Sequence, residues 1–501
     1  MLSRRSRSAR LFPAVVAIAT IIPQLLLAAD YSWNNSAAGS WFTPGSWSPN
    51  GTPGAGDNII SPTQAGTLRL NSAATTNGIV TINNLSFNGS TWVITNNSQA
   101  GKGDSSLTIA GTLAVTGGTL NFRNGANTAT NVTIGDMVIA NTGVMATGTT
   151  TAPGGSVVVN NSTTIDVGGL FRANSEGTIH LGNATVNGTI VLVNSDGSNL
   201  NRAASVTSLS GSGSIHGSNS VTTTDNAVAL TITGASDGSF SGTINNTVTL
   251  TSTSAVLSLT KAGNSVQTLS GTNTYTGNTN VTAGTLRVNG SIASSALTTV
   301  SSGATLSGRG VVGALQLHSG ASLALGVAQG TLGSLGSLSV GATTLMGGSS
   351  LDWNINDASG VAGTNWNTLH VDGALTVDAS AAGNPFVFNI HTLDLSANTA
   401  GDAAGFDSLV NYVWTLADFS DGIVYGAGLS FENAFALNTA SFLNDYTGTF
   451  SLIEIGNSIA LSYTAVAIPE PSTVTLIAGS LALGLGAYAK RRRQKQTLAT
   501  S

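Results

Sequence analysis

Residues 257–290 read LSLTKAGNSVQTLSGTNTYTGNTNVTAGTLRVNG, and they carry the clearest signal of the fold. In this stretch apolar residues alternate with Thr, Ser and Asn in short runs that end at Gly or Asn-Gly. Alternation with a period of two, closed by these turn residues, is typical of short β-strands. Similar runs recur through most of the chain, and long helices find almost no support before residue 380.

A fixed glycine frame links this stretch to distant parts of the chain. The frame apolar-x-x-Gly-x-Leu-x-apolar occurs around Gly118 and Gly284, and a version one residue longer occurs around Gly303, Gly320 and Gly348. Recurrence every 17 to 28 residues or so predicts a solenoid, because one coil cannot bury its apolar side chains alone. We therefore predict an all-β chain that is mainly a parallel β-helix. Coils of about 22 residues, roughly 15 of them at ~4.8 Å each, give a rod of about 70 Å.

The main alternative is a row of β-sandwich modules, because alternation by itself does not distinguish a sandwich from a β-helix.

The stretch also resembles the autotransporter-associated β-strand repeat. That family's pattern runs through Leu-Thr-Lys, Leu-Ser-Gly, Asn-Thr-Tyr-Thr-Gly and Ala-Gly-Thr-Leu, which residues 259–286 match almost throughout. The departure is at residues 264–267, where the family usually has a Gly-rich turn. The resemblance implies a passenger-type right-handed parallel β-helix and no particular activity. We expect an export route other than that of autotransporters, because the C-terminus reads as one helix and not as a translocator barrel.

Three features in order mark the C-terminal tail, residues 465–495. Pro469-Glu470-Pro471 comes first, an uncharged apolar run over 474–489 follows, and the basic cluster Lys490, Arg491, Arg492 and Arg493 comes next, with Lys495. An apolar run of this length predicts a transmembrane helix, and the basic residues after it predict that the body lies outside.

The tail resembles the PEP-CTERM sorting domain of Gram-negative bacteria. The resemblance implies that Pro469, Glu470 and Pro471 form the motif recognised by an exosortase-type membrane protease, which would release the protein to the cell surface or extracellular matrix. A plain C-terminal membrane anchor is the alternative.

Residues 1–29 read as a secretory signal peptide. Four arginines precede an apolar stretch over 11–27 that ends at Ala28-Ala29, which is the order of a signal peptide with its cleavage site. We expect cleavage after Ala29, although an uncleaved anchor has the same order. The protein is therefore expected to cross the inner membrane and reach the cell envelope, outer surface or matrix.

Composition limits the partners of the body. Between Asp30 and Ile468 there are 8 basic and 21 acidic residues, which gives a net charge near −13. An acidic surface repels phosphate backbones, so we expect no nucleic-acid partner. Charged residues form only 8% of the chain while 41% is hydrophobic, which favours ordered β-structure over disorder. The chain has no cysteine, so neither disulfides nor thiolate chemistry are available.

Each end of the predicted rod has its own composition. Residues 30–60 contain Trp33, Trp41 and Trp47, which we interpret as a Trp-rich N-terminal cap over the β-helix body of 61–380; an exposed carbohydrate platform is the alternative. The repeat itself covers 257–291. Residues 381–464 are rich in aromatic residues and predict a C-terminal β cap, in which 449–455 and 458–463 form a hairpin.

Residues that could carry out catalysis are scattered. The five histidines, His180, His216, His318, His370 and His391, form no metal-binding spacing. Carboxylates could serve a polysaccharide lyase or glycosidase on a β-helix. The candidates are Asp352, Asp357 and Asp372, and the Ser-Asp-Gly turns at Asp196 and Asp237, but none lies in a dense cluster and Asp before Gly is mostly turn chemistry.

We therefore expect no catalytic, metal or cofactor site. The first hypothesis is a structural or adhesive protein of the cell surface or matrix, which binds extracellular polysaccharide or other surface proteins along its coils. The second is a polysaccharide-active enzyme, either a lyase or a glycoside hydrolase, on the same scaffold.

Overall fold

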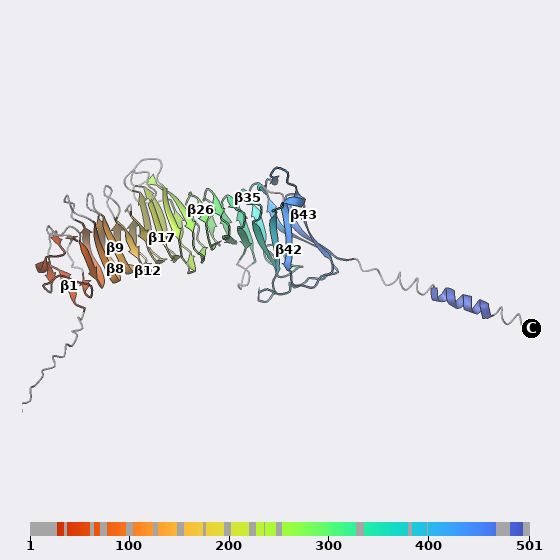
Figure 1. Cartoon of the computed structure of the whole chain (residues 1–501), viewed down its shortest axis with the longest axis horizontal. Helices are drawn as coiled ribbons and strands as arrows, with labels where there is room; N and C mark the ends of the chain where they lie inside the picture. Colours follow the sequence, from red (N-terminus) through yellow and green to blue (C-terminus); the bar gives the residue numbers. More distant parts are fainter. Residues whose placement is uncertain are drawn as a thin grey trace, which may run out of the picture.

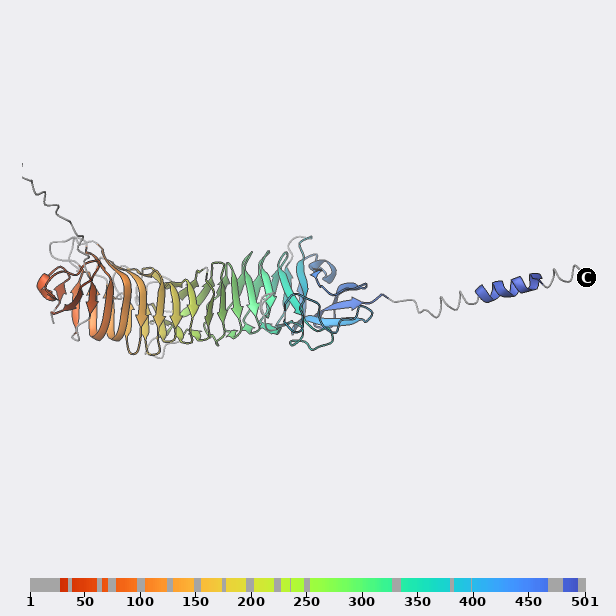
Figure 2. The same cartoon turned by 90° about the horizontal axis from the view of Figure 1, so that it is seen from below.

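The protein forms a rod of stacked β-coils in the computed structural model (Figure 1). The structure describes residues 28–34, 38–60, 65–70, 78–96, 104–123, 129–147, 155–173, 177–194, 202–219, 227–234, 236–246, 253–326, 335–378, 383–397, 399–466 and 481–493. Strands lie side by side across the long axis from one end of the rod to the other (Figure 2). This is the predicted parallel β-helix, and the sandwich alternative is wrong, because consecutive coils pair strand on parallel strand.

Each coil has three sides, which we call face 1, face 2 and face 3 in the order that the chain follows. Face 1 consists of β6 (Ile79–Ile82), the first parts of β8 (Ser105–Arg123) and β9 (Thr130–Ile139), β11 (Val157–Val159), β14 (Ile179–His180), β17 (Arg202–Val206), β20 (Ala227–Ile232), β24 (Val256–Lys261), β26 (Thr279–Val281), β29 (Thr298–Val300), β32 (Leu315–Leu317), β35 (Thr343–Met346), β38 (Leu375–Asp378) and β41 (Ile423–Tyr425).

Face 2 continues from the N-terminal end to the C-terminal end of the rod. It consists of β1 (Asp30–Trp33), β4 (Asn58–Ile60), the first part of β7 (Asn84–Thr95), the middle of β8, the end of β9, β12 (Ser162–Ile165), β15 (Asn183–Val186), β18 (Ser208–Ser210), β21 (Gly238–Phe240), β25 (Val266–Leu269), β27 (Thr285–Val288), β30 (Thr305–Gly308), β33 (Ser322–Leu325), β36 (Ser350–Ile355), β39 (Phe386–Thr392) and β42 (Phe435–Ser441).

Face 3 completes the coil. It consists of β2 (Gly39–Ser40), β5 (Gly66–Arg69), the ends of β7 and β8, β10 (Val144–Thr147), β13 (Leu170–Ala173), β16 (Thr189–Asn194), β19 (Ser214–Asn219), β22 (Thr243–Asn245), β28 (Ser291–Ile292), β31 (Val311–Val312), β34 (Ser337–Val340), β37 (Thr368–Val371) and β40 (Tyr412–Phe419). The short strand β23 (Thr253–Ser254) pairs antiparallel with β19.

The glycine frame marks a corner of the coil. All five frame glycines have a positive φ, from +63° at Gly284 to +78° at Gly348, which explains why glycine stands there. At Gly284 a Cβ would lie 2.4 Å from the carbonyl oxygen of Gly263 in the preceding coil, whereas nothing lies within 4 Å of one at Gly303. The apolar members of the frame, such as Leu286 and Val288, are fully buried.

Coil length varies far more than the sequence pattern predicts. On face 1 one coil step leads from Thr298 to Leu315, whereas the last step leads from Leu375 to Ile423. The strands of the long coils still pair in parallel with those of their neighbours, and one core continues along the rod. Coils of about 22 residues therefore describe only part of the rod, and the last step exceeds the predicted recurrence of about 17 to 28 residues.

The N-terminal end of the rod is closed by tryptophans. The side chains of Trp33, Trp41 and Trp47 are at most 3% exposed, and Trp33 and Trp47 meet edge to face with ring centroids 4.9 Å apart. β3 (Trp47–Ser48), which follows the 3₁₀ turn Pro44–Ser46, pairs antiparallel with β1. Buried rings cannot serve as an exposed sugar platform. The parallel ladder already begins here, because β1 pairs with β4.

At the other end the ladder also passes the predicted boundary at residue 380, since β39 pairs with β42. There β40 meets the antiparallel hairpin of β43 (Thr449–Glu454) and β44 (Ser458–Thr464), which confirms the predicted hairpin. The helical turn α1 (Phe431–Ala434) precedes β42.

The tail adds a helix over residues 481–493. Residues 474–480 of the expected membrane span lie outside the described residues. In the described part of the chain, no helix combines the length and apolar character needed to cross a membrane.

Candidate binding face

One column of outward side chains extends along face 1 over most of the rod. Its members occupy the same register on successive coils and are half-buried, except for the more exposed last residue. We call it the threonine column; it consists of Thr81, Thr108, Thr133, Val158, His180, Ser205, Thr231, Thr260, Asn280, Thr299, Gln316, Thr344, Thr376 and Val424.

Several hydroxyls of the threonine column are not used in hydrogen bonds within the described part of the protein. Within the described residues, the hydroxyls of Thr231, Thr260 and Thr299 make no hydrogen bond. Neighbouring strands lie ~4.8 Å apart, so the column presents a hydroxyl, a methyl or an amide group at that interval. Only His180 in the column can carry a charge, and its ring contacts the hydroxyls of Ser205 (2.9 Å) and Thr207 (3.3 Å).

Face 2 uses its polar groups differently, because they join coils to one another. The Asn84 side chain accepts a hydrogen bond from the backbone N–H of Thr112 (2.7 Å). Asp136 accepts from the hydroxyl (2.6 Å) and the backbone N–H (3.1 Å) of Ser162, and these bonds hold the pKa of its carboxyl below the usual range. These oxygens stabilise the stack and are occupied within the protein.

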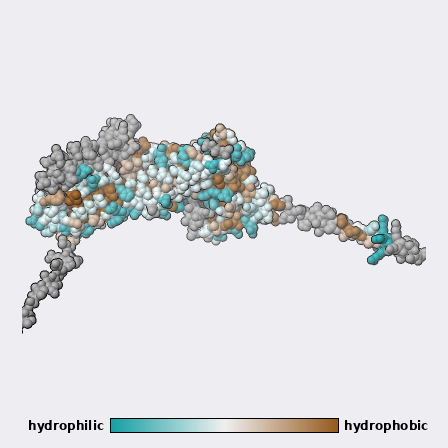
Figure 3. Space-filling model, viewed as in Figure 1, coloured by the Kyte–Doolittle hydropathy of each residue, from teal (hydrophilic) through white to brown (hydrophobic). Residues whose placement is uncertain are grey.

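A shallow hollow of about 260 Å³ interrupts face 1 beside the column. It lies where small residues stand on adjacent coils and is lined by Gly177, Thr178, Ile179, Ala203, Ala204, Ser205 and Thr231. A neutral hollow next to a row of hydroxyls suits an uncharged polyhydroxylated ligand. Figure 3 shows few strongly hydrophobic residues along the middle of the visible face, as expected for a hydrated rod.

Residues 257–290 contain polar side chains inside the coil. Lys261 is 0% exposed, and its ammonium donates to the carbonyl oxygens of Ala262 and Gly263, both at 2.8 Å, and of Ala283 at 3.3 Å. Desolvation lowers the pKa of Lys261, and the charge of Asp237 opposes this shift. Lys261 thus links the corners of two successive coils.

Two further residues of the repeat join its coils. The Asn273 side chain accepts from the N–H of Ile244 (2.9 Å) and donates to the carbonyl of Ser291 (3.1 Å), so it touches the coil before and the coil after its own. The buried hydroxyl of Tyr275 bonds to that of Thr279 (2.7 Å), which bonds to that of Ser295 (2.9 Å). Burial raises the pKa of Tyr275.

The departure from the repeat pattern at residues 264–267 has a structural explanation. Gln267 belongs to strand β25, not to a turn, and its buried side chain reaches beyond the adjacent Gly238 to the coil before that. There it accepts from the N–H of Leu209 (3.2 Å) and donates to the Leu209 carbonyl (2.9 Å). A Cβ on Gly238 would lie 2.5 Å from the Gln267 amide oxygen, so the glycine makes room for this bridge.

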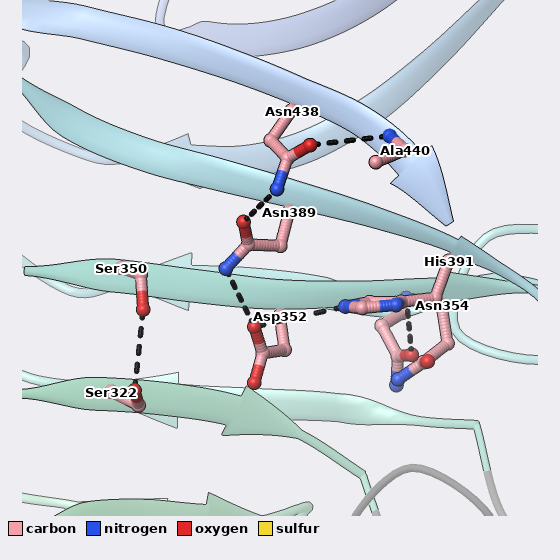
Figure 4. A network of polar contacts seen from close by, with 9 residues as sticks. Ser322, Ser350, Asp352, Asn354, Asn389, His391, Asn438 and Ala440 are labelled. Carbon is pink, nitrogen blue, oxygen red and sulfur yellow. Dashed lines mark hydrogen bonds and ion pairs between the residues drawn. The ribbon is translucent and has the colours of Figure 1, made fainter. Parts of the chain in front are cut away.

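The acidic candidates of the sequence analysis do not come together. Asp352 lies on β36 and accepts from the Asn389 amide (2.9 Å), which in turn accepts from Asn438 (3.0 Å), as Figure 4 shows. His391 approaches Asp352 to 3.7 Å. Asp357 accepts from Ser359 in a local turn, Asp372 follows β37, and Asp237 accepts from the N–H of Val266. Asp196 lies outside the described residues.

A pair that the sequence did not reveal lies on face 3. His370 and Asp418 stand side by side on β37 and β40, and the ring Nδ1 is in hydrogen-bond contact with the carboxylate. Ser339 occupies the same register one coil earlier. The described residues show no hydrogen bond between Ser339 and His370, and the two paired side chains are 51% and 40% exposed. His370, Asp418 and Ser339 are thus aligned in the order of a base, its orienting carboxylate and a hydroxyl. The hydroxyl of Ser339, which would be the nucleophile, makes no hydrogen bond to the His370 ring among the described residues.

The other histidines have ordinary polar surroundings. His216 contacts Asn245 and Ser214, and His318 is half-buried at the end of β32. Across the described ranges, no three His, Cys, Asp or Glu side chains form a group that could hold a metal ion.

The sorting motif Pro469-Glu470-Pro471 lies outside the described residues. Lys490, Arg491, Arg492 and Arg493 form the last turn of the described C-terminal helix and are exposed.

Comparison with known proteins identifies the repeat. A family model described as Passenger-associated-transport-repeat matches residues 259–288. These residues span β24 to β27 and include Lys261, Gln267, Asn273 and Tyr275, so the match coincides with the polar-filled coils. The match confirms the resemblance to an autotransporter-type repeat. No curated protein matches the chain.

Proposed function

We propose that this protein is a secreted structural and adhesive rod of the cell surface or extracellular matrix, which binds neutral extracellular polysaccharide along face 1. The threonine column carries this proposal. A row of weak, equally spaced hydroxyl and amide contacts gives little affinity for one sugar unit, but many such contacts on one polymer add up. The passenger-type repeat supports a secreted, surface-exposed role.

The proposal includes the sorting tail. In it, Pro469, Glu470 and Pro471 are recognised by an exosortase-type membrane protease, and the apolar run with its basic cluster is a transient anchor. The order of these three features behind a signal peptide supports this reading. After removal of both ends the body is strongly acidic, which supports neutral polymers or other surface proteins as partners over nucleic acids.

The proposal assigns no catalysis to the rod. Two observations support this: the candidate aspartates lie apart, and among the described residues Ser339 makes no hydrogen bond to the exposed pair His370 and Asp418.

Two triple variants test the role of face 1. Thr231→Val, Thr260→Val and Thr299→Val remove three hydroxyls from the threonine column but keep side-chain volume. With about 1 kcal/mol for each lost hydrogen bond, the affinity for a polysaccharide should fall roughly a hundredfold. The control variant carries the same replacement by valine at Thr268, Thr285 and Thr305, which face outward on face 2. Sedimentation with insoluble cellulose, chitin and matrix polysaccharide measures binding. Equal losses in both variants, or no binding to any polymer, would refute the proposed role.

Intact mass spectrometry of the protein from cells and medium tests the tail. A C-terminus near Pro471 supports sorting and release, whereas a released chain that retains Arg491 to Arg493 contradicts it.

A further inference from the structure

A second hollow lies at the C-terminal end of the rod, away from the threonine column. Its volume is about 200 Å³, and we call it the end pocket; it is lined by Phe431, Glu432, Phe435, Leu437 and Leu452. The rings of Phe431 and Phe435 lie 5.4 Å apart, and the ring of Tyr425 lies 6.5 Å from that of Phe435. Three aromatic rings and two leucines therefore provide an apolar surface at an end of the rod that is exposed to solvent.

Two carboxylates stand beside this apolar surface. Glu432 accepts from the hydroxyl of Ser430 (2.7 Å), and Glu454 accepts from the hydroxyl of Tyr425 (3.3 Å). Glu432 lines the end pocket itself, and Glu454 stands beside it through Tyr425, whose ring lies next to Phe435 of the pocket. Burial, with the negative charges of Glu454 and Glu432, raises the pKa of Tyr425 to about 12. In the described part of the chain neither glutamate has a basic partner.

The chemistry of the end pocket selects a particular kind of ligand. A neutral sugar can stack on the rings and donate hydroxyls to the carboxylates, but it leaves both negative charges uncompensated. A metal ion needs several oxygen ligands, and no suitable group exists among the described residues. A guanidinium group, by contrast, stacks on aromatic rings, binds carboxylates through paired N–H donors and has an apolar stem that covers leucine side chains.

We propose that the end pocket binds an arginine side chain of a partner protein, with the guanidinium between Glu432 and Glu454 and against the Phe431 ring. The site would attach the end of the rod to a basic protein surface. This function is independent of polysaccharide binding by face 1.

The test uses the full-length chain and N-acetyl-arginine methylamide as the probe, with the uncharged N-acetyl-citrulline methylamide as its matched analogue. Binding is followed by NMR titration of the probe. Glu432→Gln and Glu454→Gln should each weaken arginine binding roughly fivefold, since each removes one exposed ionic contact. Both glutamates are exposed, so these variants should fold normally. Phe431→Leu should also weaken binding.

Asp166→Asn is the control, because it removes the same charge from a distant coil, and it should leave binding unchanged. Equal binding of the citrulline probe, or unchanged binding in both glutamine variants, would overturn the proposal. A variant with Lys490→Gln, Arg491→Gln and Arg492→Gln should bind the probe as the wild type does. Tighter binding in that variant would show that the chain's own tail occupies the pocket, and the assignment to a partner would be wrong.

Discussion

Substitution of Lys261 by methionine tests whether the buried polar groups of the repeat stabilise the stack. Methionine keeps most of the apolar stem but removes the ammonium, which donates two hydrogen bonds of 2.8 Å and one of 3.3 Å. The lost bonds amount to about 5 kcal/mol, and relief from burying a charge offsets roughly 2 kcal/mol. We expect the coils around Lys261 to lose about 3 kcal/mol of local stability.

Hydrogen exchange measured by mass spectrometry is the suitable assay, because a long repeat array does not unfold in one two-state step. Protection of amides in β24 to β27 should fall about a hundredfold, since 1.4 kcal/mol corresponds to a factor of ten. Amides in β8 and β9 should be unaffected. Arg309→Met, which removes an exposed positive charge two coils beyond Lys261, should change protection by less than threefold.

The effect of Lys261 on stability should depend on pH in a definite direction. Because the folded pKa of Lys261 lies below that of the unfolded chain, the unfolded state binds more protons at alkaline pH, and the wild type gains stability as pH rises toward 10.5. Methionine cannot contribute this gain, so the destabilisation by Lys261→Met should grow over that window. Unchanged protection in the variant, or a loss spread evenly along the rod, would refute the reasoning.

Two further predictions concern the same coils. Gly284→Ala should lower local stability by more than 3 kcal/mol, because the new Cβ would meet the Gly263 carbonyl oxygen. Gly303→Ala should lower it by only about 1 kcal/mol, because only the positive φ is unfavourable there. Local hydrogen exchange measures both losses, and equal effects would contradict the steric account. Tyr275→Phe should cost about 1–2 kcal/mol at pH 7. Because burial raises the Tyr275 pKa, the wild type should lose stability as pH rises above 10, and the variant should lose less; parallel alkaline curves would count against this explanation.

The sequence pattern predicts the coil well and the alignment of coils poorly. The glycine frame correctly marks corners, because a positive φ next to a neighbouring backbone leaves glycine as the one unstrained residue at Gly118 and Gly284. The members of the threonine column cannot be identified from their spacing in the sequence. Thr299 and Gln316 are neighbours on face 1, and so are Thr376 and Val424, although very different lengths of chain separate them.

The unequal coil lengths also prevent the sequence from predicting which polar side chains meet. His370 and Asp418 are adjacent because β37 and β40 pair on face 3, although a long segment of chain separates these two strands. Glu454 meets the Tyr425 hydroxyl through the antiparallel hairpin, whose strands the sequence predicts but whose position it does not. Lys261 is recognisable as part of a family pattern, yet its burial against three carbonyls follows only from the stacked corners.

The bridge from Gln267 to Leu209 has a mechanical consequence. Where coils contact only their nearest neighbours, a pulled solenoid can peel one coil at a time. Gln267 ties its coil to the second coil before it, across Gly238, so three coils must yield together at this point. A rod pulled at its two ends should therefore unravel from the ends and stop near the middle.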